Sequence, residues 1–495
     1  MSVGNVKSRA MADTFFDRPP SLRINAWTGS DMAPALLDAD HVLWSLDRHS
    51  AGNGADAWEM APPLVNDWDW QSPQVGWGLV LPDDEAIQPP ARRATADDAP
   101  EAMQRLLAAR PGSPVLRWRA SGAGIGELLR YGSDGRVWPL SLVSRAGIAP
   151  PELPRFLLIY APPDRIPWAF QYAANLGRYV GRLFLEGEAL DHYVDALVGD
   201  WAGAQCDLHA PLVWSVDHGQ PDITWLMDRA ISRKLSDAWS KDEDFSRFTG
   251  LFGADATHDK LVAALTSTKP GLVVTTSHGM TGPLNNAPAM AAQLGVPVDV
   301  SRRTLDLATL CDRWQPDGAI WYAHACCSAG SDTVSAYDSL FDPASDVARI
   351  LAGVAAGCGA RIAPLPQRLL GAPRPLRAFI GHVEPTFDWT LRDPYTAQPL
   401  AHSLREALYD KLFEGGLRRP IGWALARVFD EAGVLLGQWT QACAAFNKAL
   451  PTSVDAALYY QIAALDRQHT VILGDPTVAL PAMGSVNTGV ALGPR

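Results

Sequence analysis

Short, continuously apolar runs alternate with amphipathic segments over the last two-thirds of the chain, and this alternation most constrains the fold. The runs have the length and the β-branched content of strands that are buried on both faces of a parallel sheet. They fall at residues 155–161, 179–185, 210–219, 271–279, 318–327, 376–383 and 470–480. Segments between them, such as 255–267 and 344–357, carry apolar residues at helical spacing. The pattern predicts an α/β protein whose helices pack on a mainly parallel sheet.

Composition and charge limit the classes of protein to which the chain can belong. With 47% hydrophobic and 19% charged residues, the 495 residues can bury the cores of several units. The formal net charge of −12 is opposite to that of a dedicated nucleic-acid-binding protein. No stretch is apolar for the roughly 20 residues of a membrane-spanning helix, and the start lacks the apolar core of a secretory signal. Six scattered cysteines favour reduced thiols in the cytoplasm.

The alternating pattern divides the chain into regions. An N-terminal region, 1–150, is rich in Trp, Pro and Gly, with an irregular start, loop-like pieces and one expected helix at 97–109. The remaining regions are a first α/β subdomain at 151–268, a second at 269–483 and a C-terminal tail at 484–495. For the N-terminal region we consider the roles of a prodomain, a regulator or a surface for an activating partner.

Two of the apolar runs end in reactive side chains. The run GLVVTTS leads into His278 and Gly279, and AIWYAHA leads into Cys326 and Cys327. Reactive groups collect at the carboxyl ends of strands in an open parallel sheet, so neighbouring strands would bring these residues together. An imidazole beside a thiol generates the nucleophilic thiolate. The histidine precedes Cys326 by 48 residues (326 minus 278), which agrees with the caspase-type spacing of about 50.

Gly279 adds a second catalytic element. Its amide can approach a scissile carbonyl closely because the residue has no side chain. Together with the amide of Cys326, it would form an oxyanion hole for a tetrahedral intermediate. This chemistry needs no metal or organic cofactor. The His-x-Cys-Cys sequence that begins at His324 is not a zinc-binding spacing, and the chain has no paired Cys-x-x-Cys.

With these motifs the sequence resembles the clan CD cysteine peptidases, which include caspases, gingipains, legumain, separase and bacterial CHAT proteins. The shared marks are a strand that ends in His-Gly, here SHG at 277–279, and a later strand that ends in Ala-Cys, here 325–326. Four further stretches are similar to gingipain-like bacterial members: FLLIYAPPDRIPWAFQYAANLGRYVGRLF, ACCSAGSDTVSAYDSLF, FIGHVEPTF and ILGDPTV. The resemblance covers about 155–480.

The resemblance implies a caspase/gingipain-like α/β/α sandwich with two subdomains, to which the N-terminal region is added. It also implies a cysteine endopeptidase that cuts a protein substrate through a thioester, with His278 as the general base and Cys326 as the nucleophile. By analogy with bacterial relatives, the setting would be signalling or defence.

The doubled cysteine departs from the motif that relatives usually carry. Alignment on A-C-x-x-A-G selects Cys326, with the flanking small residues in place, whereas alignment on C-S-x-G selects Cys327 as an alternative nucleophile. On an extended segment the two thiols point to opposite faces, so only one can meet His278.

Other polar residues near these motifs are weaker candidates. His218 also ends an apolar run, but it lies 108 residues before Cys326 (326 minus 218), too far for the caspase-type spacing. Asp332 or Asp338 would be placed to orient His278, as an acid does in a catalytic triad.

Further polar residues accompany the strand ends. His324 precedes the cysteine by two positions, which predicts either a place near the site or an inner, hydrogen-bonded group. His382, in GHVEPTF, is a candidate for the wall of the active-site cleft, with Glu384 and Asp388 nearby, and for a role in specificity, although a solvated loop fits the pattern equally well.

Two further classes of function remain open from the sequence. In the first, the fold is a catalytically inactive binding or scaffold module, and Cys326 is an inert core thiol. In the second, Cys326 and Cys327 act as the redox sensor of a regulatory protein. Alkylation rates and the effect of peroxide would separate these alternatives from a peptidase.

Overall fold

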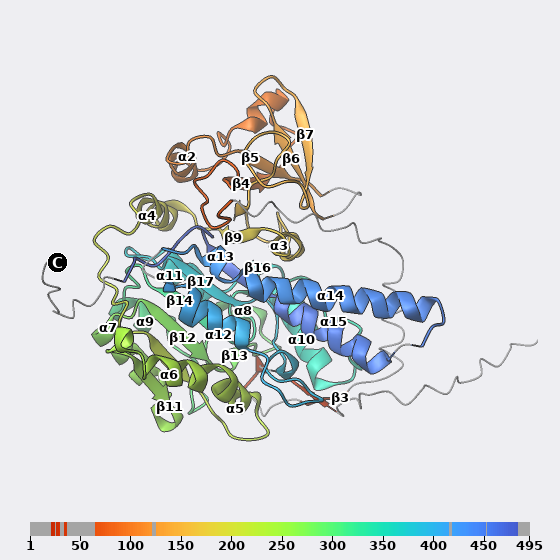
Figure 1. The fold of residues 1–495 in the computed structure, drawn as a ribbon. Helices are drawn as coiled ribbons and strands as arrows, with labels where there is room; N and C mark the ends of the chain where they lie inside the picture. The colour runs from red at the N-terminus through yellow and green to blue at the C-terminus, as the bar shows by residue number, and fades with distance from the viewer. Residues whose placement is uncertain are drawn as a thin grey trace, which may run out of the picture.

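A single twelve-stranded sheet organises the chain. The structure, a computed structural model, describes residues 21–24, 26–29, 34–36, 65–120, 125–414, 418–451 and 453–483. The predicted C-terminal tail at 484–495 lies outside these residues, as do residues 1–20 of the predicted irregular start. Figure 1 shows the sheet running through a large body and continuing into a smaller lobe above it.

The predicted strands are confirmed, and most of them pair in parallel. In spatial order the sheet contains β11 (Thr249–Phe252), β10 (Leu212–Ser215), β12 (Leu272–Thr276), β14 (Ile320–His324), β17 (Ala378–His382), β18 (Thr470–Gly474), β9 (Tyr179–Leu183), β8 (Phe156–Tyr160), β4 (Trp77–Pro82), β5 (Val115–Trp118), β6 (Glu127–Tyr131) and β7 (Val137–Ser141). Only β17–β18, β5–β6 and β6–β7 are antiparallel among the pairs of this sheet. The chain is therefore an α/β protein with a mixed, mainly parallel sheet.

Helices connect the parallel strands, as such crossovers require. The longer ones are α2 (Glu101–Ala108), α3 (Trp168–Asn175), α4 (Gly187–Val198), α6 (Arg233–Trp239), α7 (His258–Thr268), α9 (Leu307–Arg313), α10 (Asp346–Cys358), α11 (Pro364–Leu370), α14 (Ala426–Asn447) and α15 (Val454–Gln468). Shorter ones are α5 (Ile223–Met227), α8 (Ala287–Ala292), α12 (His402–Glu406) and α13 (Ile421–Ala424). Thr257 and Ser345 cap α7 and α10 by accepting backbone N–H bonds, which explains where these predicted helices begin. None of the described helices is both long and apolar enough to cross a membrane.

The described part of the N-terminal region contains more regular structure than its composition suggests. Strands β4 to β7 and helix α2 form the upper lobe of Figure 1, and β4 pairs in parallel with β8 of the main body. Trp77 on β4 donates its indole N–H to Asp475, at 3.0 Å, in the turn after β18. Arg110 stacks on Trp77, with 4.4 Å from the guanidinium carbon to the ring centre, and bonds the same carboxylate at 3.1 Å. These aromatic and polar contacts connect the lobe to the turn after β18.

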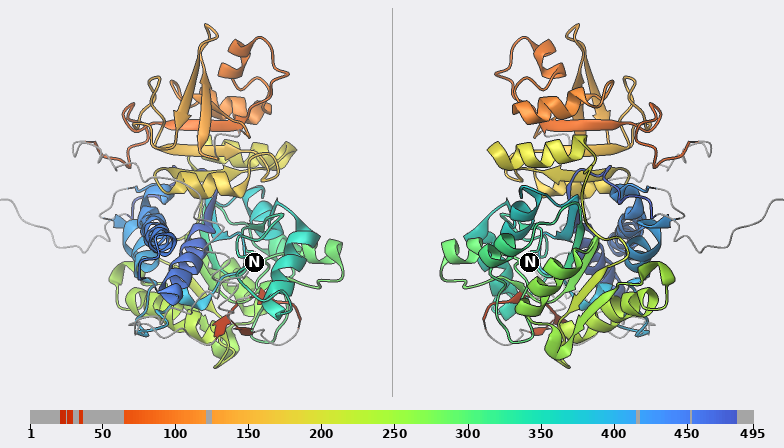
Figure 2. Two further views of the ribbon diagram at one scale, coloured as in Figure 1. Left: turned by 90° about the vertical axis from the view of Figure 1, so that its right-hand side faces the viewer. Right: turned by 90° about the vertical axis from the view of Figure 1, so that its left-hand side faces the viewer.

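The first described residues lie on the large body, away from the lobe that follows them in sequence. Strand β2 (Ala26–Trp27) pairs in parallel with β13 (Gly279–Met280), directly after His278. Strands β1 (Ser21–Arg23) and β3 (Pro34–Leu36) pair with each other, and β15 (Gly330–Ser331) pairs with β16 (Arg361–Ile362). In Figure 2 the short red segments lie low on the body, opposite to the orange lobe.

Candidate functional site

Four neighbouring parallel strands deliver polar residues to one edge of the sheet. Strands β10, β12, β14 and β17 lie side by side and run in the same direction, so their carboxyl ends meet there. Thr276 of β12 lies opposite His324 of β14. His278 and Cys326 each follow this matched pair by two residues, and the two therefore emerge next to one another. The structure thus places the predicted base and the predicted nucleophile at adjacent strand ends.

Gly279 lies directly against the backbone of Cys326. A Cβ atom built on Gly279 would be 2.0 Å from the Cys326 carbonyl oxygen and 2.9 Å from its nitrogen. Any side chain at position 279 would therefore separate the two strand ends. The requirement for glycine comes from this close approach, and it brings the two predicted oxyanion-binding amides into one neighbourhood.

Asp222 orients His278. It is the N-cap of α5, where Oδ1 accepts bonds from the Thr224 amide, at 2.8 Å, and from its hydroxyl, at 2.7 Å. Its Oδ2 accepts the Nε2–H of His278 at 2.9 Å. Burial alone would raise the pKa of Asp222, but the bonds from His278 and Thr224 hold that pKa well below its ordinary value.

The protonation of His278 follows from this partner. An ionised carboxylate only accepts hydrogen bonds, so Nε2 of His278 carries the proton and Nδ1 is the basic nitrogen. Nδ1 is buried and has no hydrogen-bond partner among the described residues. A fixed tautomer next to a cysteine is one requirement of general-base catalysis, although Nδ1 does not form a hydrogen bond with the Cys326 thiol in this structure.

The orienting acid differs from the two predicted ones. No hydrogen bond to His278 is formed by Asp332, which is half-buried, or by Asp338, which is exposed, within the described part of the chain. Asp222 lies 56 residues before the histidine, at the end of a different strand. One local signal for it exists, because the Asp-x-Thr sequence at 222–224 is a helix-capping pattern just after the apolar run that ends near His218.

His218 belongs to the site despite its distance in sequence. It follows β10, the neighbour of β12, and its ring stacks on that of His278, with centroids 5.9 Å apart and planes 15° apart. Its Nε2 is buried without a hydrogen-bond partner in the described structure. Burial lowers the pKa of His218, the neighbouring Asp222 opposes this shift, and His278 adds to it. Sequence separation was a poor guide here because sheet order, not chain order, decides which strand ends are neighbours.

The two cysteines have different surroundings. The Sγ atom of Cys326 accepts the amide of Thr386, which follows β17, at 3.3 Å. Cys327 is fully buried with a left-handed φ of 55°, and its amide donates to the carbonyl of Glu384 at 3.2 Å. Burial, with Cys326 and Glu384 nearby, raises the pKa of the Cys327 thiol well above its ordinary value. These surroundings favour Cys326 over Cys327 as the reactive thiol.

His324 and His382 face each other inside the protein. Nε2 of His382 lies 3.2 Å from Nδ1 of His324, which also accepts the hydroxyl of Tyr322 at 2.8 Å. His382 is 3% exposed, so its ring is packed inward and does not line an open cleft. Glu384 is also buried, accepts bonds from Ser335 and from the Ala336 amide, and has its pKa raised to about 7 by burial.

The site is closed in this structure. His278 and Cys326 are both 0% exposed. The ring of Trp27 stacks on His278, with centroids 5.9 Å apart and planes 28° apart. The residues that carry the proposed chemistry are therefore covered by a segment from the beginning of the chain.

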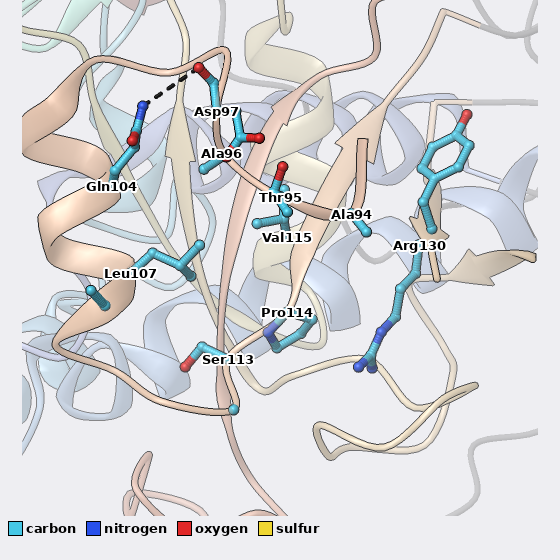
Figure 3. A pocket seen from close by; sticks show the side chains of 13 residues that line it. Ala94, Thr95, Ala96, Asp97, Gln104, Leu107, Ser113, Pro114, Val115 and Arg130 are labelled. Carbon is cyan, nitrogen blue, oxygen red and sulfur yellow. Dashed lines mark hydrogen bonds between the residues drawn. The ribbon is translucent and has the colours of Figure 1, made fainter. Parts of the chain in front are cut away.

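A pocket of about 460 Å³ lies elsewhere, in the upper lobe. Figure 3 shows Gln104, Thr95 and Arg130 among its lining side chains, and none of the residues at the strand ends described above contributes to it. Within the described ranges, no group of three or more His, Cys, Asp or Glu side chains is placed to hold a metal ion.

Comparisons with known proteins found no match, so a functional assignment rests on the geometry of the site. No model of a known protein family matches the chain, and neither do the curated proteins or the solved structures with which it was compared.

Proposed function

We propose that the chain is a caspase-like cysteine endopeptidase of gingipain-like architecture, with subdomains at 151–268 and 269–483. One observation carries the proposal: Asp222 fixes the proton of His278 on Nε2, which leaves Nδ1 as a base at the strand end beside Cys326. Supporting it are the order His-Gly then Ala-Cys along the sequence and the packing of Gly279 on the Cys326 backbone.

The mechanism is acyl transfer to sulfur. Nδ1 of His278 takes the thiol proton of Cys326, and the thiolate attacks the peptide carbonyl. The amides of Gly279 and Cys326 stabilise the oxyanion of the tetrahedral intermediate. As the carbon–nitrogen bond breaks, His278 donates its proton to the leaving amine and a thioester remains. His278 then takes a proton from water, which hydrolyses the thioester and regenerates the thiol.

The substrate is an extended segment of a protein, and the N-terminal region is the proposed surface for an activator. By analogy with the bacterial members that the sequence resembles, the setting is signalling or defence in the cytoplasm. The sparse cysteines, six in 495 residues, fit a reducing compartment.

The test is cleavage of a positional-scanning peptide library by wild type, Cys326→Ala, Cys327→Ala and His278→Ala. Because Trp27 covers His278, each protein is also prepared with Trp27→Ala. We expect Cys326→Ala and His278→Ala to abolish cleavage, and Cys327→Ala to retain it. Cys311→Ala, on α9, is the control for loss of a half-buried thiol that packs on a different core cluster from that of Cys326.

The cleavage results identify the nucleophile and test the peptidase assignment. Cleavage by Cys326→Ala together with inactivity of Cys327→Ala would transfer the role of nucleophile to Cys327. Absence of cleavage in every protein that carries Trp27→Ala, with the fold intact by circular dichroism, would contradict the peptidase assignment.

A binding module is the second candidate, and the complete burial of His278 and Cys326 favours it. An activated thiolate reacts with iodoacetamide at neutral pH much faster than a buried structural cysteine does. Alkylation of Cys326 in the Trp27→Ala protein no faster than that of an ordinary exposed thiol, together with no cleavage, would support the binding module. A peroxide-induced change in oligomeric state that survives His278→Ala would instead support a redox sensor.

A further inference from the structure

A short N-terminal segment, defined here as Ile24 together with Ala26 and Trp27, crosses the candidate site. Ile24 forms an antiparallel bridge with Phe387, in the loop that follows β17. Ala26 and Trp27 form β2 and pair in parallel with Gly279 and Met280 of β13. The segment is therefore paired on both sides, in the manner of a peptide added to strand edges.

These two sets of contacts flank the reactive groups. Phe387 follows Thr386, whose amide donates to the Sγ atom of Cys326. Gly279 follows His278 and packs on the Cys326 backbone. The segment thus extends from the cysteine side of the site to the histidine side, where the backbone of an extended substrate would have to lie for its carbonyl to reach the thiol.

Trp27 makes the most specific contacts of the segment. Its ring stacks on His278, and the guanidinium carbon of Arg302 lies 5.0 Å from the ring centre. Its carbonyl accepts the amide of Thr281 at 3.0 Å. With 5% exposure Trp27 is nearly as buried as the residues it covers. An imidazole face and a guanidinium together make a subsite for an aromatic side chain.

We propose that this cleft binds an extended peptide by strand addition to β13, with an aromatic side chain held between His278 and Arg302, and that the chain's own N-terminal segment occupies it and keeps the site closed. The part that concerns cleavage rests on the proposed function, whereas the binding part does not. A competing peptide, or a partner that binds the N-terminal segment and moves it away, would open the site, because the described pairing of β2 with β13 is two residues long.

The first test measures access to Cys326 and needs no peptidase activity. Iodoacetamide modification of Cys326 is followed by mass spectrometry at pH 7.5 in wild type and Trp27→Ala. We expect modification to be at least tenfold faster in Trp27→Ala. Trp27→Phe keeps an aromatic ring on His278 and should remain as slow as wild type. Equal rates in wild type and Trp27→Ala would overturn the closing role of the segment.

Trp138→Ala is the matched control. Trp138 lies on β7 of the upper lobe and also stacks with an arginine, the Arg136 guanidinium carbon lying 5.0 Å from its ring centre. Its replacement removes the same chemical group without touching the site, so Cys326 should stay protected. Melting temperatures of all variants establish that faster modification reflects opening and not unfolding. A rate increase in Trp138→Ala equal to that in Trp27→Ala would contradict a local role for Trp27.

The second test supplies the segment in trans. A synthetic peptide with the sequence of residues 21–29, SLRINAWTG, is added to the Trp27→Ala protein. We expect it to slow the modification of Cys326 at least fivefold, and expect the same peptide with alanine in place of tryptophan to have no effect. Equal protection by both peptides, or by neither, would overturn the aromatic subsite.

Failure of the two proposals gives different results. If the chain binds peptides but is not a peptidase, Trp27→Ala will be modified faster and protected by the peptide, yet will cleave no library member. If the chain is a peptidase that the segment does not close, wild type will cleave as fast as Trp27→Ala and the two alkylation rates will agree.

Discussion

Asp222 and His278 form a carboxylate–imidazole pair, 2.9 Å from Oδ2 to Nε2, although 56 residues separate them in the chain. The carboxylate is positioned independently of the histidine, because its other oxygen caps α5 through two bonds from Thr224. The helix start and the strand end therefore fix the direction of the imidazole ring before any substrate binds.

The first prediction concerns Asp222 as a positioning residue. In Asp222→Asn the amide can donate as well as accept, so the histidine is no longer held with its proton on Nε2. We expect kcat to fall by about 10²–10⁴-fold with a much smaller change in KM.

A nearby acid provides the control for this experiment. Asp217→Asn removes a carboxylate from the same turn that pairs with Arg229, at 3.0 Å, and does not touch His278. It should leave both kcat and KM near wild type. Equal losses in the two variants would show that Asp222 acts on the fold and not on the histidine.

The second prediction concerns the close approach of Gly279. In Gly279→Ala the added Cβ would lie 2.0 Å from the carbonyl oxygen of Cys326, and backbone atoms cannot rotate away as a side chain can. We expect the free energy of unfolding to fall by about 3 kcal/mol. Urea denaturation would measure this change.

Gly437→Ala is the matched glycine substitution. Gly437 is exposed within α14, and a Cβ built there meets nothing within 4 Å. Alanine should raise the free energy of unfolding by up to about 1 kcal/mol through its higher helix propensity. Opposite signs for the two glycines are the expected result, and a neutral Gly279→Ala would contradict the strand-end packing.

The third prediction concerns Arg182, which is fully buried on β9. Its guanidinium donates to the side chain of Gln171 and to the carbonyls of Ala161, Ile166 and Pro167, so it holds the loop between β8 and α3. Arg182→Met removes the arginine donor from the buried acceptors of Gln171, Ala161 and Ile166 and should lower the free energy of unfolding by about 3 kcal/mol.

Lysine should not rescue this position. Arg182→Lys has one terminal nitrogen and cannot reach acceptors that lie on several sides of a planar guanidinium. Arg165→Met, at an exposed position in the same loop, is the control and should change stability by less than about 0.5 kcal/mol. A full rescue by lysine, measured by urea denaturation, would show that charge alone is required.

The fourth prediction concerns stability in acid. Burial lowers the pKa of His324 and of His469 to about 3, so both are neutral in the folded protein. In the unfolded chain a histidine binds a proton below about pH 6.5. The stability that each neutral histidine contributes is therefore present above that pH and is lost, by about 1.4 kcal/mol per pH unit, as the pH falls towards 3.

His469→Phe isolates this contribution. Phenylalanine keeps the ring that packs on Tyr172 and Tyr337 but cannot bind a proton. Between pH 6 and 4 the free energy of unfolding of His469→Phe should fall less steeply than that of wild type. The difference in slope should be about 1.4 kcal/mol per pH unit, the contribution of one buried neutral histidine. Parallel slopes for wild type and His469→Phe would contradict a neutral His469.

Two buried acids make the free energy of unfolding change with pH in the direction opposite to that of the buried histidines. Burial raises the pKa of Glu384 and of Asp466 to about 7, so the folded protein retains their protons where the unfolded chain has lost them. Their contribution is lost as the pH rises through 7. The contribution of His469 is therefore measured as a difference in the free energy of unfolding between wild type and His469→Phe at the same pH.

The sequence by itself determined the elements and the chemistry of two strand ends. Continuous apolar runs predict buried strands because both faces of such a strand are covered, and all seven predicted strands occur. The placement of His278 and Cys326 side by side also followed from the sequence, since reactive groups that end neighbouring parallel strands share one edge. The strands of the upper lobe did not follow, because their short runs are interrupted by Trp, Pro and Gly that are typical of loops.

Only the tertiary structure decided what surrounds that pair. Asp222 and His218 reach His278 because β10 lies next to β12, and Trp27 reaches it because β2 pairs with β13. Periodicity and capping patterns depend on residues a few positions apart, and they carry no information about which distant strands become neighbours. Sheet order is fixed when the whole core is buried together. Local sequence patterns could therefore mark Asp222 as a helix cap, but they could not predict that Asp222 and Trp27 contact His278.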